Sequence, residues 1–99
     1  MNKTIMFREQ TYEITTCWKN DSTLILGFGD FIDNTGDSCS ILCEYNIDFD
    51  KCMIGAWYGN DFILVYSEYS NFSVYKNVLP LSDVEVDLIK VTAVSAAYR

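Results

Sequence analysis

Apolar and polar residues alternate along much of this chain, most clearly from Cys39 to Asp50. The odd positions of this stretch can all be buried: Cys39, Ile41, Cys43, Tyr45, Ile47 and Phe49. The even positions are Ser40, Leu42, Glu44, Asn46, Asp48 and Asp50. A period of two is typical of a β-strand with one buried face and one face in water. We therefore predict a single strand over the whole stretch, with its carboxylates on the wet face.

Other β-prone segments lie on both sides of this strand. The predicted strands cover 4–7, 12–19, 23–28, 51–58, 62–69 and 72–78,. Turn residues separate them at Asn20-Asp21-Ser22, Gly59-Asn60-Asp61 and Ser70-Asn71, and Pro80 ends the last,. The segments at 23–28 and 62–66 are apolar on both sides, which predicts central strands. Glycines at 27 and 29 predict a bulge or bend that curves the sheet.

The C-terminal segment carries two competing patterns. Val84, Val86 and Leu88 alternate with acidic residues, which favours a strand from Val84 to about Val94,. Ser82 followed by Glu85 has the form of a helix capping box, and the alanines near the end favour helix,. We expect the strand and keep a helix from about Ser82 as the alternative.

These elements predict a mainly β fold in a single domain over residues 1–99. The expected architecture is a small antiparallel barrel or strongly curved sheet of about seven to eight strands. The alternative is an α+β fold with a C-terminal helix. An apolar fraction of 49%, with 15% aromatic residues, is ample for one core and argues against disorder,.

The net charge of −7 is concentrated in the middle of the sequence. Between Asp21 and Asp61 there are eight acidic residues and one base, Lys51, whereas acids and bases balance outside that window. Such charge argues against nucleic acid or an anionic membrane as a direct partner and favours a basic protein. Simple solubility is the alternative explanation.

Known reaction and metal motifs are missing from the sequence. The acidic loop from Asp30 to Asp37 fails as a calcium loop, because no glycine stands sixth and no glutamate twelfth,. Cys39 and Cys43 on one strand would be about 13 Å apart, too far for a disulfide or a shared zinc ion. We expect four reduced, buried cysteines. There is no histidine, the commonest general base,. We therefore expect no enzyme activity, no metal and no cofactor.

The remaining hypothesis is a partner-binding surface. Glu44, Asp48 and Asp50 would recur along one strand at multiples of about 6.7 Å, close to two phosphate steps of DNA. Neighbouring aromatic residues would add anchors for a partner. The expected partner-binding residues are Asp30, Asp33, Asp37, Glu44, Asp48, Asp50, Asp61, Phe31, Trp57 and Tyr58.

We expect a small acidic inhibitor that binds protein, foremost a bacterial immunity protein that neutralises a nuclease toxin by blocking its basic active-site cleft. One alternative is a phage-encoded nucleic-acid mimic that inhibits a host defence nuclease. Another, of a different class, is a small-molecule-binding or catalytic β-barrel. The chain has no long apolar run and no export-signal pattern, so we expect a cytoplasmic location,. The sequence leaves the oligomeric state open.

Overall fold

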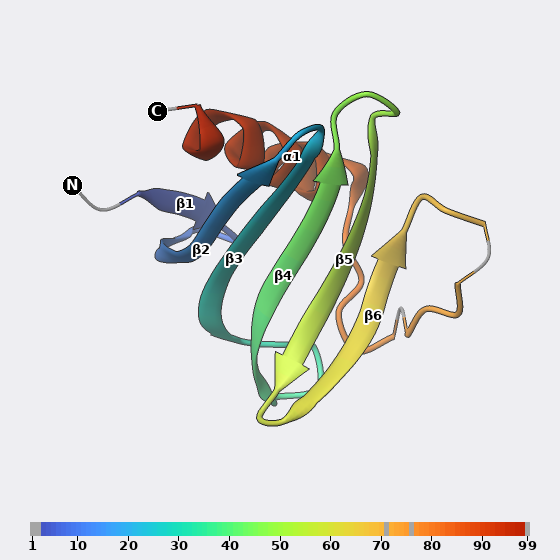
Figure 1. The fold of residues 1–99 in the computed structure, drawn as a ribbon. Coiled ribbons are helices and arrows are strands. Elements are labelled where there is room, and N and C mark those ends of the chain that lie inside the picture. The colour runs from blue at the N-terminus through green and yellow to red at the C-terminus, as the bar shows by residue number, and fades with distance from the viewer. Residues whose placement is uncertain (1–2, 71, 76, 99) are drawn as a thin grey trace.

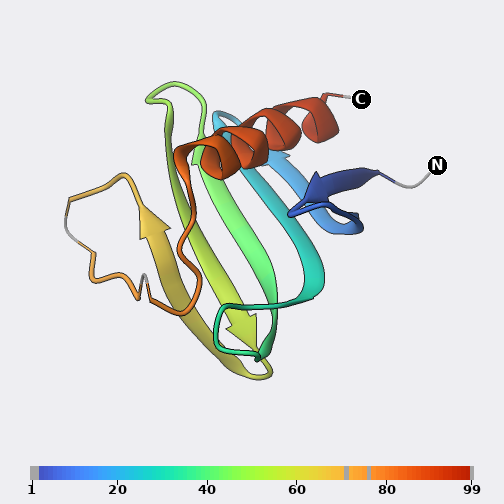
Figure 2. The ribbon, with the colours of Figure 1, turned by 180° about the vertical axis from the view of Figure 1, so that it is seen from behind.

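The fold is one antiparallel sheet with a helix on one of its faces (Figures 1 and 2). It comes from a computed structural model that describes residues 3–70, 72–75 and 77–98. The strands are β1 (Thr4–Phe7), β2 (Gln10–Asn20), β3 (Thr23–Ile32), β4 (Ser38–Asn46), β5 (Lys51–Tyr58) and β6 (Asp61–Ser67), and the helix is α1 (Asp83–Ala97). The strands pair in sequence order, β1 to β6. Each connection is therefore a hairpin, and successive loops lie at opposite ends of the sheet.

The sheet remains open, so the predicted barrel is wrong and the α+β alternative describes the fold better. The described part of the chain contains six strands rather than seven or eight. No strand covers the described residues of the predicted segment at 72–78, since 72–75, 77 and 78 are irregular. Asn71 and Lys76, which belong to the predicted turn and strand there, lie outside the described residues.

The C-terminal segment is a helix, so the expected strand from Val84 to Val94 is wrong. Ser82 caps it: its hydroxyl accepts from the N–H of Glu85 at 3.1 Å, and the Glu85 carboxylate accepts from the N–H of Ser82 at 3.0 Å. The buried side chains are Val86, Ile89, Lys90, Ala93 and Ala96, three or four residues apart,. That spacing places one stripe of the helix against the sheet.

The core lies between α1 and the face of the sheet that it covers (Figure 2). Alternate residues of the central strands point into it, among them Leu24, Leu26, Ile41, Cys43 and Ile54. The predicted buried face of β4 is confirmed for Cys39, Ile41, Cys43 and Tyr45. Cys52 is buried too, but Cys17 is exposed, contrary to the expectation of four buried thiols; all four are free.

The organising strand is shorter than predicted. β4 ends at Asn46, whose side-chain oxygen accepts from the N–H groups of Asp48 and Phe49 at 3.0 and 3.1 Å. This local turn competes with strand extension. Phe49 is consequently exposed rather than buried, and Asp48 and Asp50 belong to a loop rather than to the wet face of a strand. The bend predicted at the glycines is present as a register shift between Gly29 and Phe31.

Candidate partner-binding face

The acidic residues of the central window do not form one surface. Asp33, Asp37 and Asp61 lie at the end of the sheet that carries the β3–β4 loop and the β5–β6 turn, and Asp48 and Asp50 lie at the end with the β4–β5 loop (Figure 1). The nine residues of β4 separate the two ends by about 27 Å,. The predicted ladder of Glu44, Asp48 and Asp50 is therefore wrong, because only Glu44 is on the strand.

Asp33 is buried, and both of its carboxylate oxygens accept hydrogen bonds. One carboxylate oxygen accepts from the N–H and hydroxyl of Thr35, at 2.8 and 2.7 Å, and from the N–H of Asp37 at 3.0 Å. The other accepts from the Tyr58 hydroxyl at 2.6 Å. Burial alone would raise the pKa of Asp33, but these hydrogen bonds outweigh it and lower the pKa from 3.8 to about 2,. Asp33 and Tyr58 thus hold the β3–β4 loop onto β5.

Asp50 is also engaged within the molecule. Its carboxylate accepts from the Tyr45 hydroxyl at 2.7 Å and lies 3.3 Å from the ammonium of Lys90. The same ammonium lies 2.8 Å from Glu68. Burial alone would lower the pKa of Lys90, but its two carboxylate partners raise it above the ordinary value,. A lysine held in its charged form serves here as a link between α1, the β4–β5 loop and the end of β6.

The other predicted partner-binding residues divide between surface and core. Those exposed are Asp30, Asp37, Glu44, Asp48, Asp61 and Trp57. Asp48 nevertheless accepts a hydrogen bond from the hydroxyl of Ser22 across two neighbouring turns. Phe31 is buried in an aromatic cluster, with ring centroids 5.3 Å from Phe7 and 5.7 Å from Tyr12. Phe31 is therefore a core residue.

None of the described residues forms a helix or second sheet over the face opposite α1, and Figure 1 views the sheet from this side. The strand register places its side chains in three rows, which we call the open face. The rows are Trp18, Ile25, Glu44, Met53 and Ser67; then Thr16, Gly27, Leu42, Gly55 and Leu64; then Gly29, Ser40, Trp57 and Phe62. Most of these residues are apolar, and Glu44 is the only charged one in the three rows. The next row on the same side is polar and carries a base: Asn20, Thr23, Asn46 and Lys51,.

Three large aromatic side chains stand out on the open face. Trp18, Trp57 and Phe62 are 53%, 41% and 45% exposed. Trp57 and Phe62 are directly paired across β5 and β6, with ring centroids 4.7 Å apart. The ring of Phe62 also lies over Gly55, where a Cβ atom would collide with it. Gly55 therefore leaves room for the end of the Phe62 ring against β5.

Of the open face, only Glu44 and Trp57 were among the predicted partner-binding residues. Trp18, Ile25, Leu42, Met53, Phe62 and Leu64 were missed. The signal was present in the sequence, because the segments at 23–28 and 62–66 are apolar on both sides. Such strands are normally covered on both faces, whereas this sheet has a helix on only one.

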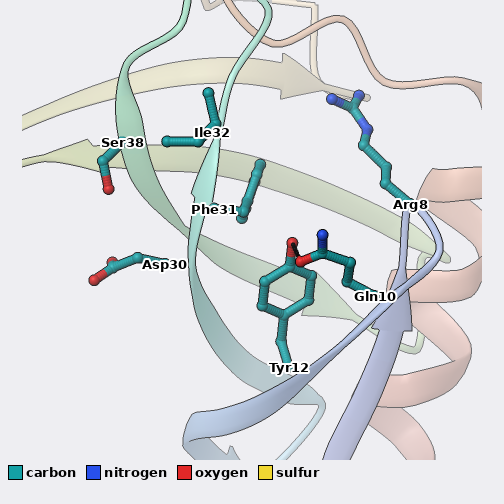
Figure 3. A pocket seen from close by; sticks show the side chains of 7 residues that line it. All are labelled: Arg8, Gln10, Tyr12, Asp30, Phe31, Ile32 and Ser38. Atoms are coloured by element: carbon teal, nitrogen blue, oxygen red, sulfur yellow. Dashed lines mark hydrogen bonds between the residues drawn. The ribbon is translucent and has the colours of Figure 1, made fainter.

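A pocket with a volume of about 360 Å³ lies beside the β1–β2 hairpin (Figure 3). Tyr12, Phe31 and Ile32 line it together with Arg8 and Asp30, whose charged groups lie on opposite sides of the pocket. Arg8 is already engaged, since its guanidinium lies 2.7 Å from Glu85 and donates to the Pro80 carbonyl at 2.7 Å. Ser38 also lines the pocket, but no hydrogen bond pairs its hydroxyl with a base among the described residues.

Within 3–70, 72–75 and 77–98, no three Cys, Asp or Glu side chains gather as ligands for a metal ion. In the same part of the chain, α1 is too short and too polar to cross a membrane.

Comparison with known protein families, curated sequences and solved structures gives no match to this chain.

Proposed function

We propose that this protein acts by binding another protein through the open face. The main support for the proposal is that α1 covers only one face of the sheet. The other face presents three half-exposed aromatic side chains, Trp18, Trp57 and Phe62. Contiguous apolar surface of this kind commonly marks an interaction site. Tryptophan in particular is enriched among the residues that supply most of the binding energy.

We further propose that the partner is basic. The chain carries a net charge of −7, and exposed carboxylates of Asp30, Asp48 and Asp61 lie toward the two ends of the sheet that carries the open face. An interface with an apolar centre and a charged rim gains specificity and speed of association from opposite charge on the partner. A bacterial immunity protein that neutralises a nuclease toxin by covering its basic active-site cleft fits this description.

The two alternatives receive less support from the geometry. A nucleic-acid mimic would need a regular array of free carboxylates, whereas the acids lie at both ends of the sheet and Asp33 and Asp50 are bonded internally. A ligand-binding barrel would need a closed sheet, and this sheet is open. Protein binding through the open face is therefore the function that we put forward.

Affinity capture with matched variants tests the proposal. We expect wild-type protein to capture a basic partner from the source cell, and the Trp57→Ser/Phe62→Ser variant to lose it. Phe49→Ser removes an even more exposed aromatic residue outside the open face and should retain the partner. For a toxin, co-production should also rescue growth. Equal capture by all three proteins, after circular dichroism shows each to be folded, would contradict the proposal.

A further inference from the structure

Glu44 occupies an unusual position at the centre of the open face. It stands on β4 directly between Ile25 of β3 and Met53 of β5 in the same row. A groove of about 190 Å³ adjoins it, lined also by Leu42, Leu64 and the Phe62 ring. The side chain is exposed, and no described residue makes a hydrogen bond or ion pair with it. Here a free carboxylate lies among apolar side chains.

A partner that covers the open face must also cover this carboxylate. Removing an ionised carboxylate from water without a compensating charge or donor is strongly unfavourable. Ile25, Leu42 and Met53 lie beside Glu44, and none of their side chains can donate a hydrogen bond. Asn46, next on the same side of β4, and its pair Lys51 can donate, but neither bonds Glu44, and the Lys51 ammonium lies 5.8 Å from the ring centroid of Tyr69. Glu44 thus has no compensating group among the described residues, and a partner that covers it has to supply one.

The shape of the site favours arginine as that group. A guanidinium can donate two parallel hydrogen bonds to a carboxylate, while its three-carbon stem packs on apolar surface. The groove places apolar side chains beside the carboxylate, so a single arginine could satisfy both surfaces. A lysine ammonium could supply the charge but not the paired geometry.

A second copy of this chain fits the same site poorly. It would bring another net charge of −7 and another Glu44 toward the first. The base nearest to the rows is Lys51, in the polar pair with Asn46 at the end of β4 and β5, and its ammonium lies 5.8 Å from the ring centroid of Tyr69. Charge complementarity thus selects a basic protein.

We infer that the open face binds its partner by receiving an arginine side chain of that protein at Glu44, with the arginine stem in the adjoining groove. This inference rests on the proposed function and names the partner chemistry that the face recognises. It makes Glu44 the residue that determines specificity, while the aromatic residues supply contact area.

Peptide probes test the selection of arginine directly. The probes are acetyl-Leu-Arg-Leu-amide and the same peptide with citrulline, a neutral isostere, titrated against ¹⁵N-labelled protein. We expect the arginine peptide to shift the amide signals of Ile25, Glu44 and Met53 and to bind about fivefold more tightly than the citrulline peptide at low salt. Glu44→Gln should abolish this preference. Asp61→Asn removes the same charge outside the three rows and should preserve it.

The failing outcomes separate the inference from the proposed function. Equal binding of both peptides at the open face would overturn the arginine site and leave protein binding intact. Loss of the preference in Asp61→Asn as well would show that Glu44 acts only through the net charge, and this would also overturn the arginine site. Signal shifts confined to other surfaces would overturn the arginine site too. A dimer that Phe62→Ser dissociates in sedimentation experiments would identify a second copy as the occupant and overturn both proposals.

Discussion

Asp33 and Asp30 show how differently two nearby carboxylates serve the protein. Asp33 is buried with four hydrogen bonds to its oxygens, whereas Asp30 is exposed. We expect Asp33→Ala to lower the free energy of unfolding by about 2 to 3 kcal/mol, because the Tyr58 hydroxyl and loop N–H groups lose their acceptor. Asp30→Ala should change it by less than about 0.5 kcal/mol. Urea denaturation at neutral pH measures both, and similar losses in the two variants would refute the assignment.

The contribution of Asp33 should also depend on pH in a defined direction. Its pKa is lowered from 3.8 to about 2 in the folded protein, so folding favours the ionised form. The stabilisation is fully present above the unfolded pKa and is lost as the pH falls through 3.8 towards 2,. The stability difference between wild type and Asp33→Ala should shrink over that interval. A difference that stays constant down to pH 2 would contradict the role of the ionised carboxylate.

Lys90 is a second residue whose charge stabilises the fold. Replacing it by methionine leaves Glu68 without its ammonium partner, so we expect a loss of about 2 to 4 kcal/mol in the free energy of unfolding. A second substitution, Glu68→Gln, should recover part of that loss by removing the uncompensated charge. Lys51→Met, at an exposed lysine, is the matched control and should have little effect. Thermal unfolding of wild type, Lys90→Met, Glu68→Gln, the double variant and Lys51→Met checks this; additive losses from Lys90→Met and Glu68→Gln would exclude a direct pair.

For single residues, the sequence shows which chemical groups are present but not which other residues surround them in the fold. The loop composition around Asp33 predicts turns and exposed acids, but the contact with Tyr58 joins positions 25 residues apart in sequence. The Lys90 pairs join positions 40 and 22 residues apart. Such partners are set by the strand order, which local patterns do not specify. This is why Asp33 and Asp50 were expected on a docking surface.

The helix α1 shows how two local signals can conflict within one element. β-branched residues with alternating acids favoured a strand, yet the capping box and the apolar stripe from Val86 to Ala96 prevailed. We expect Ser82→Ala to destabilise the protein by about 1 kcal/mol, because the N–H of Glu85 loses its acceptor. Ser73→Ala, at an exposed serine in the preceding loop, serves as control. Equal unfolding midpoints for Ser82→Ala and wild type in urea would show that the cap contributes nothing.

The strand β4 illustrates the limit of periodicity at an element boundary. The alternation continues to Asp50, but Asn46 folds the chain back through its side chain, and Asp50 has a φ of 51°. The period therefore predicted the buried face of β4 correctly but not its end. Turn chemistry at a single residue determined where the strand stops.

The contact between β5 and β6 gives a prediction for the open face itself. An alanine at Gly55 would displace the Phe62 ring, so we expect Gly55→Ala to cost about 1 kcal/mol and to change the emission of Trp57,. In the Phe62→Ala background the same substitution should cost less, because the ring is gone. A double-mutant cycle in urea measures this coupling, and a coupling of zero would contradict the position of the ring.

For the whole molecule, the sequence predicts the class of fold and the sign of the charge, but not how strands and charges are arranged in space. The periodicity predicts a mainly β fold, and the composition predicts an excess of negative charge in the middle of the sequence. However, a run of acids that is continuous in sequence is divided in space, because hairpin connections place successive loops at opposite ends of the sheet. The open face was likewise not predicted. The segments apolar on both sides predict central strands, which is confirmed for β3 but wrong for β6, an edge strand of the sheet.

The central claim is that a partner covers the open face, and the chain provides two built-in reporters of this event. It contains two tryptophans, Trp18 and Trp57, and both lie on the open face. In ¹⁹F NMR of 5-fluorotryptophan-labelled protein, both signals should respond to replacement of H₂O by D₂O in the free state. In complex with the unlabelled partner, both should shift and lose most of that response. A complex that forms while both signals remain unchanged would show that the partner binds elsewhere.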